Sequence, residues 1–72
     1  MNVFINGKKI TIQNTNNQHV VSQALIQFLS EYQQQTTFAV ALNSDFISKE
    51  NYEQTHLKDG DIIDVLFPIQ GG

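Results

Sequence analysis

Only one stretch of this chain has the periodicity of an amphipathic helix, and short β-type runs lie on both sides of it. Its apolar residues recur at the spacing of 3.6 residues per turn and so share one stripe: Val20, Val21, Ala24, Leu25, Phe28, Leu29 and Tyr32. This pattern predicts a helix over about 18–34, ended by the segment "QQQTT". Because no other segment can cover a sheet, this helix must lie across one face of a single sheet.

The first twelve residues predict an antiparallel hairpin. Asn6-Gly7 separates two short runs of β-branched and aromatic residues, VFI and ITI. Asn-Gly in this position is typical of a two-residue type I′ turn, because both turn residues need a positive φ. We expect strands at roughly 2–6 and 9–13, with Phe4 on the opposite face from its neighbours.

Three later segments complete the predicted sheet. Residues 38–42 form an apolar run of strand length, 46–48 return from a turn, and 62–67 form the last strand. The last strand has no crossover helix of its own, so we expect it beside the first strand. The predicted fold is therefore α+β: a mixed four- to five-stranded sheet with one main helix across one face, which is the β-grasp arrangement.

The length and composition fit one domain. A chain of 72 residues supports a single small core. We assign 1–67 to the β-grasp domain and 68–72 to a flexible C-terminal tail, since Pro68 cannot donate a hydrogen bond to a neighbouring strand. Five extended residues would reach about 17 Å.

Several function classes are disfavoured by composition. The net charge is −3, with four lysines and no arginine, which argues against nucleic-acid binding. The absence of cysteine excludes disulfides, thiolate metal sites and a cysteine nucleophile. The first residues do not have the features of a signal peptide, and no apolar run approaches the length of a membrane helix. We expect no membrane contact and a cytoplasmic location.

The sequence offers no catalytic constellation of its own. His19 and His56 lack the spacing of a metal-binding pair and are expected to be solvated surface residues. Asp59 and Asp61 flank Gly60, a pattern typical of a turn. We therefore predict that the protein is not an enzyme and has no catalytic residue, metal site or bound cofactor.

The candidate reactive group is the carboxylate of Gly72, which follows Gly71 at the end of the sequence. Glycine has no Cβ, so such an end can thread a narrow channel in another protein. A carboxylate becomes electrophilic after conversion to an acyl-adenylate, from which a sulfur nucleophile can displace AMP. We expect covalent modification at Gly72, with Pro68, Ile69, Gln70 and Gly71 threading the active site of the partner.

Four segments carry a resemblance to a known family. They are "MNVFING" at the start, "VALN" at 40–43, "ISKENYEQTHLKDGD" at 47–61, and the final Gly71-Gly72. In order and spacing the chain resembles the bacterial sulfur carriers of thiamine biosynthesis, the ThiS family. This resemblance implies a ubiquitin-like β-grasp protein whose Gly72 is adenylated by an ATP-dependent, ThiF-like adenylyltransferase and converted to a thiocarboxylate. It also implies a sulfur donor such as a cysteine desulfurase, and a ThiG-like thiazole synthase that receives the sulfur.

Three alternatives share parts of this pattern. The ending "FPIQGG" also looks like the small subunit of molybdopterin synthase, the sulfur carrier of molybdenum-cofactor synthesis. A ubiquitin-type modifier would use the same activated end with a lysine as nucleophile. A plain β-grasp interaction module would have a Gly-Gly end without a chemical role.

Two apolar residues are predicted to form a docking patch. If the first and last strands pair, Phe4 and Leu66 lie side by side on the sheet face away from the helix. Exposed apolar residues are common on protein surfaces. The resemblance favours a patch that positions the tail in the active site of the partner.

Overall fold

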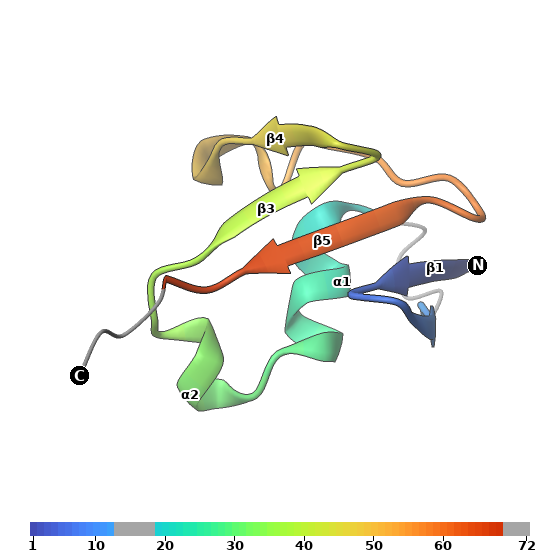
Figure 1. Cartoon of the computed structure of the whole chain (residues 1–72). Helices are drawn as coiled ribbons and strands as arrows, with labels where there is room; N and C mark the ends of the chain where they lie inside the picture. Colours follow the sequence, from blue (N-terminus) through green and yellow to red (C-terminus); the bar gives the residue numbers. More distant parts are fainter. Residues whose placement is uncertain (13–18, 69–72) are drawn as a thin grey trace.

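The computed structural model describes residues 1–12 and 19–68. These residues form a five-stranded sheet in the order β2-β1-β5-β3-β4, with the helices on one side of it (Figure 1). In chain order the elements are β1 Asn2–Ile5, β2 Lys8–Thr11, α1 Val21–Phe28, α2 Glu31–Gln34, β3 Ala39–Leu42, β4 Asp45–Ile47, the 3-10 helix η1 Lys49–Asn51 and β5 Ile62–Leu66.

The N-terminal hairpin is confirmed. Strands β1 and β2 pair antiparallel with Ile5 opposite Lys8, so Asn6 and Gly7 alone make the turn. Their φ angles are 51° and 82°, as a type I′ turn requires. The turn between β3 and β4 is built in the same way, since Asn43 and Ser44 have φ angles of 49° and 75°.

The mixed sheet is also confirmed. Strand β5 lies parallel to β1 on one side and antiparallel to β3 on the other. It is therefore the central strand, and the first and last strands are neighbours as the topology predicts. This arrangement is the β-grasp fold, and β5 carries the chain from the centre of the sheet to Pro68.

The helical prediction is correct in position but wrong in length. Helix α1 ends at Phe28, and a separate short helix, α2, begins at Glu31. Ser30 breaks the helix because its hydroxyl accepts a hydrogen bond from the Gln33 N–H, while the Gln33 side chain accepts one from the Ser30 N–H. This capping box starts a new helix at another angle. Tyr32, predicted on the buried stripe, is consequently 78% exposed.

The core lies between α1 and the inner face of the sheet. It is built from aliphatic side chains of β1, β3, β5 and α1, together with Leu57 from the long connection before β5. The largest fully buried members are Ile5, Ile63, Val3, Val21 and Val40. Pro68 follows β5 and is exposed. Residues 69–72 lie outside the described residues, so the boundary between domain and tail stays a prediction.

Candidate functional site on the outer sheet face

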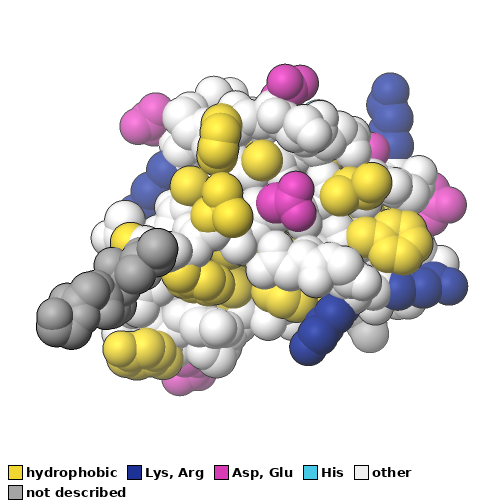
Figure 2. Space-filling model, viewed as in Figure 1, with side chains coloured by type: hydrophobic (Ala, Val, Ile, Leu, Met, Phe, Trp, Pro, Cys, Tyr) yellow, Lys and Arg dark blue, Asp and Glu magenta, His cyan; other side chains and the backbone are white. Residues whose placement is uncertain are grey.

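The sheet has an outer face that the helices do not cover. Along β5, Ile63 and Val65 are buried in the core, while Ile62 and Leu66 point to the opposite side and are 51% and 52% exposed. Phe4 of the neighbouring strand β1 and Phe46 of the edge strand β4 are exposed apolar residues as well. Apolar side chains therefore gather on this face over several strands, as Figure 2 shows.

Phe4 and Leu66 both lie on this outer face, but they are not side by side. The parallel register places Phe4 opposite Ile62. Leu66 lies four residues further along β5, which is roughly 13 Å in an extended strand, and stands opposite Ala39 of β3. The prediction that Phe4 and Leu66 lie side by side is therefore wrong. The first and last strands do pair as predicted, but the sequence does not reveal the register of that pairing.

Two exposed apolar residues of this face were not predicted from the sequence. Ile62 lies four residues before Leu66 on β5, and side chains alternate between the two faces of a strand. Alternation counted back from Leu66 therefore predicts that Ile62 lies on the outer face as well. Phe46 lies in a three-residue strand, where alternation is too short to read, and its place on the sheet follows from its pairing with Ala41.

An aromatic row holds the chain where it leaves the sheet. Phe67 packs on Phe38 with ring centroids 6.0 Å apart, and Phe38 stacks on Tyr52 at 6.4 Å. Burial against this row raises the pKa of Tyr52 above its ordinary value of 10.0. Pro68 follows directly, so the direction in which the chain departs is set by packing against the segment before β3. The predicted reactive residue, Gly72, and Ile69, Gln70 and Gly71 lie outside the described residues.

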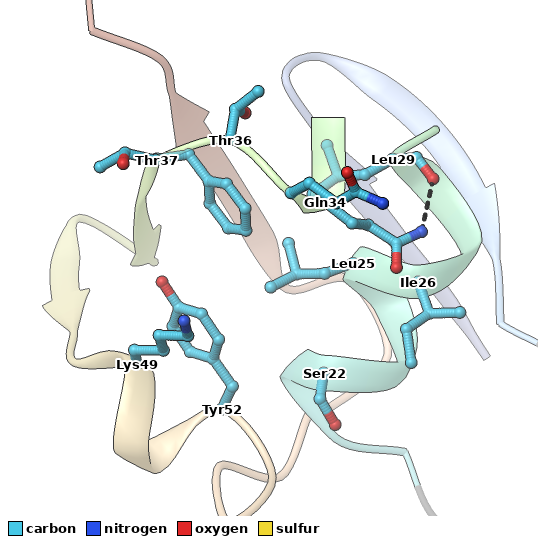
Figure 3. Close-up of a pocket in the computed structure, with 11 residues that line it drawn as sticks. Ser22, Leu25, Ile26, Leu29, Gln34, Thr36, Thr37, Lys49 and Tyr52 are labelled. Atoms are coloured by element: carbon cyan, nitrogen blue, oxygen red, sulfur yellow. Dashed lines mark hydrogen bonds between the residues drawn. The ribbon is translucent and has the colours of Figure 1, made fainter. Parts of the chain in front are cut away.

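A recess on the helical side of the molecule adjoins this aromatic row. It has a volume of about 350 Å³ and lies between α1, the segment after α2 and η1 (Figure 3). Leu25 and Phe38 line its apolar part, and the Tyr52 hydroxyl and the Lys49 ammonium lie at its edge. Lys49 is the one charged residue among the described residues that line it. No carboxylate and no imidazole lie among these described lining residues.

The titratable residues singled out in the sequence have structural surroundings. Asp59 accepts a hydrogen bond from the Asn2 N–H at 2.7 Å, and Asp61 accepts one from the Lys58 N–H at 2.8 Å, so both build the turn before β5 as predicted. His56 is exposed. His19 is not a solvated residue: its Nε2 atom is buried, and no described residue bonds to it.

Within residues 1–12 and 19–68, no three His, Cys, Asp or Glu side chains are grouped so that they could hold a metal ion. Among the helices of the same residues, none is long and apolar enough to cross a membrane.

Comparison with known proteins decides the family. The sequence profile of the ThiS family matches residues 3–72. The chain belongs to the ThiS family. Among solved structures, the crystal structure of the thiamine biosynthesis protein ThiS from Geobacter metallireducens matches with a TM-score of 0.67 and 26% sequence identity, covering 100% of both chains. A comparison with curated protein sequences gives no significant match.

Membership of the ThiS family confirms the ubiquitin-like β-grasp fold and supports a role as a small sulfur carrier protein. Such a carrier is a protein on which enzymes act, and it is not itself the catalyst. As a ThiS protein, the chain presents exposed apolar residues on the outer sheet face, and Phe67 and Pro68 follow directly after the central strand β5.

Proposed function

We propose that this protein carries sulfur for the thiazole ring of thiamine as a thiocarboxylate on Gly72. The observation that carries the proposal is the family match, which runs through Gly71-Gly72 to the last residue of the sequence. The full-length similarity to a protein named for thiamine biosynthesis supports this pathway over molybdenum-cofactor synthesis.

The chemistry requires an activated carboxylate. A ThiF-like adenylyltransferase joins the Gly72 carboxylate to the α-phosphate of ATP and releases pyrophosphate. A sulfur nucleophile then attacks the carbonyl carbon, and AMP leaves with the former carboxylate oxygen. A cysteine desulfurase supplies this sulfur as the outer atom of a persulfide, so the attack forms an acyl disulfide. A thiol then cleaves the S–S bond, which leaves the thiocarboxylate on Gly72 and a new disulfide on the thiol. A ThiG-like thiazole synthase receives the sulfur in exchange for a carbonyl oxygen of its substrate, and this oxygen returns the carrier to its carboxylate form. The protein itself binds no cofactor, and these steps take place in the cytoplasm.

The apolar outer face serves as the docking patch in this proposal. Phe4 and Ile62 lie side by side at one end of this face, and Leu66 lies at the other end, four residues further along β5. The face is continuous with the point where the chain leaves the sheet, because Phe67 and Pro68 follow Leu66 directly. An enzyme that holds this face can therefore receive residues 68–72 in its active site.

Intact mass measurement tests the proposal. The protein is incubated with the cognate adenylyltransferase, ATP, a cysteine desulfurase, cysteine and a thiol. Replacement of one oxygen by sulfur raises the mass by about 16 Da, and fragmentation should place the change at Gly72. A variant lacking Gly72 is the matched control and should stay unmodified. An unchanged mass with an adenylyltransferase that is active on another carrier would overturn the proposal.

The pathway is tested in the second half of the same experiment. The thiocarboxylate form is offered in parallel to thiazole synthase and to the large subunit of molybdopterin synthase. We expect sulfur transfer only to thiazole synthase, with the mass of the carrier returning to its starting value. Transfer to molybdopterin synthase alone would keep the carrier chemistry and replace the pathway.

A further inference from the structure

The outer sheet face contains a charged group in the middle of its apolar residues. Asp64 lies on β5 between Ile62 and Leu66, which occupy the next positions of the same face on either side. Across the sheet it stands opposite Ala41 of β3, which in turn stands opposite Phe46 of β4. Figure 2 shows an acidic side chain on this face with apolar side chains around it.

The Asp64 carboxylate is unpaired within the described part of the chain. It makes no hydrogen bond and no ion pair with any residue of 1–12 or 19–68. A lysine of the outer face, Lys9, lies on β2 opposite Phe4, two strands away from β5. Asp64 is only partly exposed. Water is therefore what satisfies this charge as long as the face stays uncovered.

A protein that covers the apolar residues must also cover Asp64. Ile62 and Leu66 flank it on one strand, so a contact that spans both removes water from the carboxylate between them. Burying an unpaired charge is strongly unfavourable, whereas a positioned lysine or arginine offsets the loss of hydration. An apolar partner surface without a cation opposite Asp64 would therefore bind weakly, whereas a partner surface with a cation at this position is favoured.

We propose that Asp64 determines which protein surface can dock on the outer sheet face. It does so by pairing with a lysine or arginine of the adenylyltransferase that is surrounded by apolar residues. The inference rests on the proposed function, because it takes the docking enzyme of that proposal as the occupant. Charge complementarity disfavours a second copy of this chain. Each copy carries a net charge of −3, and each would bring its own Asp64 to the contact.

The test is the salt dependence of binding. Affinity for the adenylyltransferase is measured by titration calorimetry for the wild-type protein, Asp64→Asn and Asp45→Asn, each at low and high ionic strength. Asp45 is an exposed carboxylate of β4, so its substitution makes the same change of charge away from the centre of the face. Urea unfolding of each variant checks that the fold is retained.

We expect Asp64→Asn to weaken binding about tenfold at low salt and to keep most of this loss at high salt, because salt screens a desolvated pair only weakly. Asp64→Lys should weaken binding further, by about a hundredfold, through repulsion of the partner's cation. Asp45→Asn should bind like the wild type. Equal affinity and equal salt dependence for Asp64→Asn and the wild type would overturn the inference.

Two further readouts separate this inference from the proposed function. If the wild type acquires the thiocarboxylate and Asp64→Asn binds equally well, the role of Asp64 is wrong and the carrier function stands. If the wild type neither binds the adenylyltransferase nor gains mass, both proposals fall. Sedimentation of the protein alone completes the test: a dimer that Leu66→Asp dissociates would assign the face to a second copy and overturn the inference.

Discussion

The side-chain amide of Asn6 forms two hydrogen bonds with the backbone of Val65, across 59 residues of sequence. The Val65 N–H donates to Asn6 Oδ1 at 2.8 Å, and Asn6 Nδ2 donates to the Val65 carbonyl at 3.2 Å. The amide thereby continues the pairing of β1 with β5 beyond the end of β1. Asn43, in the other hairpin turn, accepts from the Ile62 N–H at 2.9 Å. Two turn asparagines thus hold the central strand from both sides.

Substitution of Asn6 should separate the two roles of this residue. Asn6→Gly keeps the turn geometry and removes the amide, so we expect the free energy of unfolding to fall by about 1–2 kcal/mol. Asn6→Ala should cost about 1 kcal/mol more, because a Cβ is unfavourable at a φ of 51°. Urea unfolding of both variants measures these losses. An Asn6→Gly protein as stable as the wild type would show that the hydrogen bonds to Val65 contribute nothing.

The capping box at Ser30 should behave as a coupled pair. Ser30→Ala removes the acceptor for the Gln33 N–H and is expected to cost about 1 kcal/mol. Gln33→Ala removes the reciprocal bond to the Ser30 N–H. Because each bond holds the geometry of the other, the double variant should lose less stability than the two single losses added together. A double-mutant cycle by urea unfolding provides the measurement, and strictly additive losses would contradict the coupling.

The raised pKa of Tyr52 predicts a fall in stability at alkaline pH. Burial keeps the phenol neutral, so the folded state holds this proton more tightly than the unfolded chain does. The stabilising contribution is complete below the ordinary pKa of 10.0 and is lost as the pH rises through the folded value. In a Tyr32→Phe variant, Tyr52 is the remaining tyrosine, and tyrosinate absorbance reports it alone. We expect a midpoint above 10.0 in buffer that returns to about 10 in urea. A midpoint of 10.0 in the folded protein would contradict the prediction.

Local signals and chain topology were readable from the sequence, whereas register and long-range contacts were not. Asn6-Gly7 predicts its own turn because the required φ angles are a property of those two residues. The pairing of β5 with β1 follows from the lack of a crossover helix. The register of Phe4 with Ile62 depends on how the whole core packs, so it could not be read. The same holds for the contact between Asn6 and Val65.

The break at Ser30 is a different kind of miss. The pattern S-x-x-Q at Ser30 and Gln33 is a legible capping signal, but it lies within an apolar periodicity that continues to Tyr32. The apolar periodicity predicts one long helix, but in the structure the hydrogen bonds of the capping box end the first helix and start a second one. The outer-face residues Ile62 and Phe46 were not predicted because their place depends on how the strands pair. Gly72 was predicted from the chemistry of a terminal carboxylate and not from any feature of the fold.

The docking role of the outer face predicts a loss of activity without a loss of fold. Leu66→Asp places a charge at a position that is 52% exposed, so we expect the free energy of unfolding to change by less than about 1 kcal/mol. Adenylation should slow at least about tenfold in kcat/KM, because a charge would be buried in the contact with the enzyme. Pyrophosphate release measures the reaction. Ile26→Asp is the matched control, since Ile26 is 57% exposed but lies on α1, on the other side of the sheet.

The distance between the two ends of the face makes this experiment more informative. Phe4→Asp places the same charge about 13 Å away along the sheet, beside Ile62. If both outer-face variants slow adenylation while Ile26→Asp does not, the enzyme covers the whole face between them. If Leu66→Asp alone slows the reaction, the contact is confined to the end where the chain leaves the sheet, and Phe4 has no part in docking. Adenylation of Leu66→Asp at the wild-type rate would contradict the docking patch altogether, because Leu66 is the outer-face residue that comes last in the sequence before the C-terminal segment.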